Sequence, residues 1–258
     1  MISRLSAISL NTFREAVRDR VLYNLIVFAL VLVAGAPLLG QISIDIEQLA
    51  LINVGLSAIS LFSVVIAIFI GIGLVSKEIE KRTLYTILAR PVRRWEFIAG
   101  KFFGLLMTLV ANMALMTAGF YAAMLVYQHH LTGADARLLI AVYFTILELL
   151  MVTAITLLFS SFSTPIFSAV FSFSLFAIGT FSEDLRNFAA LAHGATKWFS
   201  TVAAYAVPNF ASLNVISQVA HQQPINGRLI LFNTLYALLY SAAVTAGAVL
   251  IFERRNLK

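Results

Sequence analysis

QLALINVGLSAISLFSVVIAIFIGIGLVS, residues 48–76, decides the fold because it runs for 29 residues without a charged side chain. About 20 helical residues cross the hydrocarbon core of a bilayer, which is about 30 Å thick. Strands of a membrane barrel would instead read as segments of about ten residues with alternating hydrophobicity. Residues 48–76 do not alternate in that way. The stretch therefore predicts a transmembrane α-helix.

The composition of the whole chain indicates the same environment. Of its 258 residues, 60% are hydrophobic and only 12% are charged, whereas soluble domains average about 45–50% and about 25%. The chain has no cysteine, which excludes a disulfide framework, a thiolate metal site and a cysteine nucleophile. A multi-pass membrane protein is the class that remains.

Four further regions are long enough to span a membrane. Residues 21–44, 102–134 and 229–252 carry no charge, and residues 138–182 carry only Glu148. The last of these regions is interrupted by Ser163, Thr164 and Pro165, and proline suits the first turn of a new helix. We therefore predict an all-α polytopic membrane protein with six transmembrane helices, at about 21–40, 49–75, 102–127, 138–160, 165–182 and 229–252.

The basic residues predict how the chain is oriented. Cytoplasmic loops are enriched in Lys and Arg, and 14 such residues fall in residues 1–20, 77–101 and 253–258. Only four fall in the opposite connections: Arg137, Arg186, Lys197 and Arg228. We expect a cell (inner or plasma) membrane protein with both termini in the cytoplasm. We therefore attribute the net charge of +6 to the basic cytoplasmic connections, and we expect no nucleic-acid partner.

Two segments outside the spans have amphipathic character. Residues 2–20 predict a helix with a basic polar side, suited to lying on anionic membrane lipid or to contacting a partner. Residues 183–228 form the extracytoplasmic segment. Because Pro208 and Asn209 interrupt its apolar part, we expect interfacial helices anchored by Trp198 and not a seventh span.

The connection between the second and third spans is more structured than a linker requires. Its apolar residues from Glu78 to Ala89 recur at helical spacing, and Pro91 ends that helix. The helix needs a surface that covers its apolar face, and the lipid headgroups and a protein partner are the two candidates.

The pattern Glu-x-x-x-x-Thr-Leu-x-x-x-Leu-x-x-Pro-Val-x-Arg-x-Glu-x-x-x-Gly-Lys, from Glu78 to Lys101, resembles the first cytoplasmic loop of ABC-2-type permeases, the membrane subunits of ATP-driven exporters. The resemblance implies that residues 78–90 are a coupling helix that docks on a separate ABC ATPase subunit. It also implies a second permease copy or a related permease. Arg82 stands where the family often has glycine, so the fit to a particular ATPase stays open. The docking residues implied are Glu78, Arg82, Thr83, Leu84, Tyr85, Ile87, Leu88, Arg90, Arg93 and Arg94.

Few other residues are candidates for chemistry. The chain lacks the Gly-x-x-x-x-Gly-Lys-Ser/Thr loop that cradles nucleotide phosphates, so ATP and Mg²⁺ are expected on the partner, with no cofactor and no metal on this chain. Glu148, an ionisable residue inside a span, indicates either a substrate-path or switch residue, or a structural hydrogen bond to Asn112 or Thr153. Gly100 and Gly104 form a Gly-x-x-x-Gly pattern that lets helices approach closely.

Three functions are compatible with these features. The first is the transmembrane subunit of an ABC exporter, which is not itself an enzyme. The second keeps the ATPase contact but transmits force to an extracytoplasmic partner through residues 183–228. The third is an ATP-independent carrier or an intramembrane enzyme, which would need more ionisable groups than Glu148 alone.

Overall fold

The computed structural model describes residues 2–19, 22, 23, 26, 27, 29–31, 35, 47–80, 94–129, 133 and 135–254. Every regular element within these ranges is helical, in agreement with the predicted fold class. The helices are α1 (Ile2–Val17), α3 (Glu47–Glu80), α5 (Arg94–Gln128), η1 (Asp135–Arg137), α6 (Leu138–Phe162), α7 (Pro165–Thr180), α8 (Ser182–Leu191), α9 (Gly194–Ala206), η2 (Ala211–Leu213), α10 (Ile216–Ala220) and α11 (Gly227–Arg254).

Among the described residues, four helices are long and apolar enough to cross a membrane: Leu49–Gly73, Trp95–Val126, Asp135–Phe162 and Gly227–Glu253. The fifth predicted span, 165–182, corresponds to α7, which passes that test only together with α8 across a bend of 56°. The first predicted span, 21–40, lies largely outside the described residues. The chain is therefore multi-pass, with four or five candidate spans in the described part.

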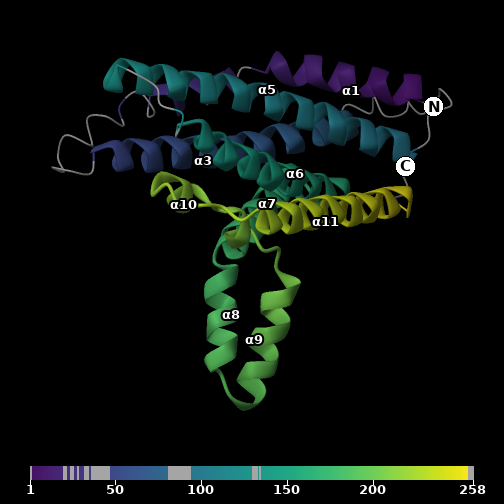
Figure 1. The fold of residues 1–258 in the computed structure, drawn as a ribbon. Helices are drawn as coiled ribbons and strands as arrows, with labels where there is room; N and C mark the ends of the chain where they lie inside the picture. The colour runs from purple at the N-terminus through teal and green to yellow at the C-terminus, as the bar shows by residue number, and fades with distance from the viewer. Residues whose placement is uncertain are drawn as a thin grey trace.

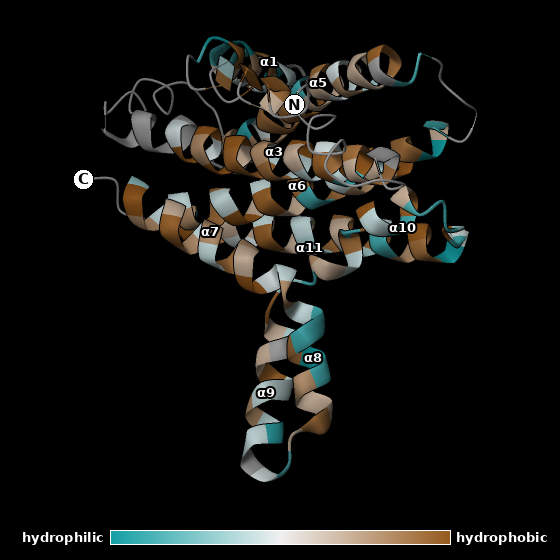
Figure 2. Cartoon of the chain, turned by 90° about the vertical axis from the view of Figure 1, so that its left-hand side faces the viewer, coloured by the Kyte–Doolittle hydropathy of each residue, from teal (hydrophilic) through white to brown (hydrophobic). Residues whose placement is uncertain are grey.

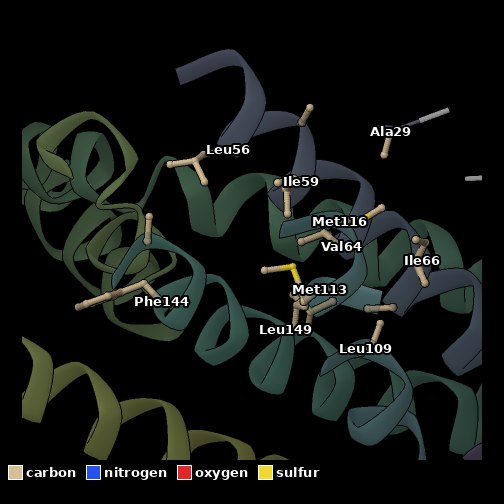
Figure 3. Close-up of a cluster of buried hydrophobic side chains, with 14 of the residues drawn as sticks. Ala29, Leu56, Ile59, Val64, Ile66, Leu109, Met113, Met116, Phe144 and Leu149 are labelled. Atoms are coloured by element: carbon tan, nitrogen blue, oxygen red, sulfur yellow. The ribbon is translucent and has the colours of Figure 1, made fainter. Parts of the chain in front are cut away.

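The core lies where α3, α5 and α6 meet (Figure 3). Leu56 and Ile59 of α3, Met113 of α5, and Phe144 and Leu149 of α6 belong to one buried cluster. Lipid is as apolar as these side chains, so close packing of helices, more than their hydrophobicity, must hold them together. Two glycines of α3 permit this closeness: a Cβ at Gly55 would lie 2.5 Å from the Phe120 ring, and one at Gly71 would lie 2.9 Å from Thr156 Cγ2.

The amphipathic helix α1 packs against α5, so protein covers its less polar side. Figure 1 shows α1 running beside α5. The contact uses the predicted glycine pair: a Cβ at Gly100 would lie 2.5 Å from Ile8 Cγ2, and one at Gly104 would lie 2.5 Å from the Ser9 carbonyl oxygen. Arg4, Arg14 and Arg18 stay exposed on the opposite side. The helix is thus present and contacts α5, while its contact with membrane lipid stays a prediction.

Helices α8 and α9 form a hairpin that extends away from the bundle, as Figures 1 and 2 both show. Hydrogen bonds hold its base: Phe210 N donates to Gly179 O at 3.2 Å, Ser182 Oγ to Asn209 Oδ1 at 2.8 Å, and Asn209 N to Tyr236 Oη at 2.9 Å. The hairpin is thus joined firmly to α7 and α11. Its helices agree with the prediction for residues 183–228, while their placement at the membrane interface stays a prediction.

Candidate functional site

The predicted docking segment connects the two longest described helices. Glu78 lies in the last turn of α3, continuous with the span and not at the start of a separate helix, and Arg94 is the first residue of α5. The other predicted docking residues lie outside the described residues: Arg82, Thr83, Leu84, Tyr85, Ile87, Leu88, Arg90 and Arg93. α3 continues for seven residues beyond Gly73, the end of its apolar span, which is about 10 Å of helix. α3 therefore extends beyond its apolar span at the end that leads into this segment.

The start of α5 is held on two sides. Phe97 and Ile98 are buried against α11, and the Phe97 ring stacks on Phe252 with centroids 5.8 Å apart. On the other side, Lys101 Nζ lies 3.5 Å from Glu15 Oε2 of α1 and 5.8 Å from the centroid of Phe97. The Lys101 side chain is only 2% exposed. A cation buried to that degree needs an anionic partner, and sequence reasoning did not identify this ion pair.

Glu148 contacts α3 and not the residues that were expected. Its Oε2 accepts a hydrogen bond from Ser60 Oγ at 3.0 Å, whereas Thr153 Oγ1 donates to the Leu149 carbonyl of its own helix. Asn112 Nδ2 has no hydrogen-bond partner among the described residues. Both Glu148 and Ser60 are only partly buried. The hydrogen bond therefore joins α6 to α3 at two residues that are each partly buried.

One side of α3 next to this pair is open. Ser57 is exposed and Asn53 is half-buried, and both lie within two turns of Ser60 on the same side of the helix. Farther along α3, Val65 and Phe69 line an apolar pocket of about 360 Å³ with Phe173 and other residues of α7.

The spacing of polar residues in 48–76 could have identified Ser60 as a partner. Asn53, Ser57 and Ser60 recur at helical intervals within an otherwise apolar run, which marks one face that avoids lipid. Ser63 belongs to a different, buried contact, since its Oγ lies 3.0 Å from Met113 Sδ. Which polar face of α3 meets Glu148 depends on how α3 and α6 pack on each other, and the two bonded residues are 88 positions apart in the sequence.

The described residues contain no group of three His, Asp or Glu side chains placed to hold a metal ion. His129 and His221 lie in separate turns, after α5 and α10 respectively. The candidate site therefore consists of the predicted docking segment, the ends of α3 and α5 that flank it, and Glu148 of α6 beside the open side of α3.

Comparison with known proteins gives one family match. No curated protein sequence matches the chain. The family model described as ABC-2 family transporter protein matches residues 6–257, nearly the whole chain. This chain belongs to the ABC-2 family of transporter membrane proteins.

Proposed function

We propose that this protein is the transmembrane subunit of an ATP-driven exporter, and that it couples ATP hydrolysis on a separate ABC ATPase to substrate movement. The observation that carries the proposal is the position of residues 81–93 between the ends of α3 and α5, in a chain that belongs to this family. The chain itself is expected to be neither an enzyme nor a nucleotide-binding protein, and to take ATP and Mg²⁺ only through its partner.

The packing of α3 and α5 supports a mechanical role for the segment. The two helices contact each other, and both contact α6. Gly55 and Gly71 bring α3 into close contact with its neighbours, and packed helices move as rigid bodies more readily than they deform. A force that the ATPase applies at residues 78–94 would therefore displace both helices together.

We propose that the open side of α3 lines the substrate path, between this chain and a second permease. A carboxylate in a membrane span is expected to face protein or a water-filled cavity, because exposing it to lipid is costly. Glu148 is only partly covered by Ser60 and its surroundings. A second permease copy or a related permease, with water between the two, would supply the missing cover.

The α8–α9 hairpin favours a second candidate function, the transmission of force to an extracytoplasmic partner. It extends from the bundle on a hydrogen-bonded base, and Trp198, Phe199 and Tyr205 are each more than 70% exposed on α9. An exposed aromatic surface of this kind suits either a protein partner or the membrane interface. In this alternative the ATPase contact is the same, but ATP hydrolysis drives force on an extracytoplasmic partner instead of substrate movement.

Affinity purification in mild detergent tests the ATPase contact that both functions share. We expect a P-loop ATPase to co-purify in stoichiometric amount with the tagged protein, and to be lost with Leu84→Asp combined with Leu88→Asp, because two carboxylates would enter an apolar docking face. Thr86→Asp combined with Ala89→Asp is the matched control, since it adds the same charge to the same segment outside the docking set. Retention of the ATPase by the first variant would contradict the coupling role, and its absence from the folded wild-type protein would favour an ATP-independent carrier.

A further inference from the structure

A second groove lies between α5 and α11, away from the open side of α3. It has a volume of about 340 Å³, and Leu150 of α6 also lines it. Phe102 and Phe103 of α5 line one wall. On α11 the lining includes Ala242 and Ala246, both exposed, and these short side chains leave the space open.

The groove has the length of one membrane leaflet. On α11 it extends from Leu238 to Val249, which is about 16 Å of helix, against about 30 Å for the hydrocarbon core. Its Val249 end is also lined by Trp95, the second residue of α5. A spanning helix from another protein would need a groove through both leaflets, whereas a lipid acyl chain needs only one.

Two hydroxyl groups in the lining do not require a polar ligand. Ser241 Oγ and Thr245 Oγ1 are buried and have no hydrogen-bond partner among the described residues. In a helix, such hydroxyls can turn to the carbonyl oxygen four residues earlier. The other residues of the lining are apolar, so the groove suits a hydrocarbon chain.

At the Trp95 end of the groove, the ends of two helices carry basic residues in the sequence. α5 begins at Arg94, which Arg93 precedes in the sequence, and α11 ends at Arg254, which Arg255 follows. Two acids lie nearby in sequence: Glu96, which is buried, and Glu253. Basic clusters between helices at a membrane surface attract anionic headgroups, and the N-terminus of α5 adds to this attraction.

We propose that the α5–α11 groove binds one acyl chain of an anionic phospholipid in the leaflet on this side, with its headgroup at the basic N-terminus of α5 and C-terminus of α11. The lipid fills the space that Ala242 and Ala246 leave open. Because its headgroup lies where the docking segment enters α5, the bound lipid stabilises the position of that helix start.

Tryptophan quenching by brominated lipids tests the proposal. The chain has two tryptophans, so Trp198→Phe leaves Trp95 as the single tryptophan, at the groove. The full-length variant is placed in two kinds of lipid nanodisc. One contains a minor fraction of brominated phosphatidylglycerol in phosphatidylcholine, and the other contains a minor fraction of brominated phosphatidylcholine in phosphatidylglycerol. One arginine near the surface contributes about 1 kcal/mol, so the preference for the anionic lipid should be about fivefold.

Two alanine-to-leucine variants of α11, one inside the groove and one outside it, provide the control. Ala246→Leu fills the groove and should abolish the excess quenching by phosphatidylglycerol, whereas Ala243→Leu, an exposed alanine of the same helix outside the groove, should preserve it. Arg254→Gln should lower the preference without filling the groove. Equal quenching by the two lipids, or quenching unchanged in Ala246→Leu, would overturn the proposal. So would a Trp95 that neither lipid quenches, the result expected if a second protein helix covers the groove.

Discussion

Glu148 and Ser60 form the hydrogen bond that joins α3 to α6 beside the proposed substrate path. The bond serves two purposes in this account. It holds the carboxylate beside the open side of α3, and it satisfies part of that carboxylate's hydrogen-bonding capacity within a predicted span. Its energetic contribution should be moderate, because hydrogen bonds between membrane helices average about 0.6 kcal/mol and reach about 1.7 kcal/mol.

Ser60→Ala is therefore expected to destabilise the protein by about 0.5–2 kcal/mol, since it leaves Glu148 Oε2 without its donor. Thermal unfolding in detergent measures the effect. Ser57→Ala is the matched control, because Ser57 lies one turn away and is exposed; its cost should stay below about 0.5 kcal/mol. Equal effects of the two variants would show that the Glu148–Ser60 bond contributes nothing.

The position of Glu148 inside a span could be predicted from the sequence, but its partner could not. A single charge within residues 138–182 is visible in the sequence, and bilayer energetics alone mark it as unusual. Its partner depends on the rotation and depth at which α6 packs on α3. Asn112 and Thr153 were reasonable expectations by residue type, yet Thr153 bonds to its own helix.

At the level of helices, α1 is attached to α5 by close backbone contact and by the ion pair between buried Lys101 and exposed Glu15. The pair lies at the start of α5, where the docking segment rejoins the bundle. We infer that α1 braces this helix start. A movement of the docking segment would then displace α1 together with α5.

Gly104→Ala tests this packing. The added Cβ would lie 2.5 Å from the Ser9 carbonyl oxygen and 2.6 Å from Thr12 Cβ, so α1 must move away, at a cost of about 1–3 kcal/mol. Gly247→Ala in α11 is the control, because its Cβ would meet only Leu158 Cδ1 at 3.7 Å; it should be neutral or stabilise by up to about 1 kcal/mol. A Gly104→Ala protein that unfolds at the wild-type temperature would contradict the contact.

The α8–α9 hairpin should be dispensable for folding. Its two helices pack mainly on each other, and the hydrogen bonds at its base involve Gly179, Ser182 and residues 209–210. Replacing residues 185–204 with a short Gly-Ser linker should leave the helical bundle intact, as measured by circular dichroism and gel filtration in detergent. If force transmission is the function, the same variant should keep its ATPase contact and lose only its output. Aggregation or loss of helicity beyond the deleted residues would contradict an independent hairpin.

Hydropathy predicted the long apolar helices of the described part but not where they end. The charge-free runs in 48–76 and 229–252 correspond to α3 and α11, because burial in lipid requires apolar side chains over the whole crossing. α3 continues to Glu80, and α5 already starts at Arg94, since a helix can extend into water where hydropathy no longer marks it. The bend after Thr180 and the packing of α1 depend on tertiary contacts that the pattern does not contain.

Topology can be tested on the whole molecule because the chain contains no cysteine. A single Gly133→Cys, in the connection between α5 and α6, should react with a membrane-impermeant maleimide on intact cells. Lys258→Cys should react only in inverted vesicles or opened cells, because the basic ends are predicted to be cytoplasmic. The reverse pattern would contradict the orientation and move the docking segment away from ATP.

The most direct test of ATP coupling combines the docking segment with the open side of α3. In inverted membrane vesicles, the reaction rate of a single Ser57→Cys with an impermeant maleimide reports access to the proposed path. ATP with vanadate is expected to lower this rate several-fold, because closure of the ATPases shifts α3 and α5 together. Leu84→Asp combined with Leu88→Asp should remove the effect. A rate that ATP leaves unchanged in the wild-type background would contradict the account.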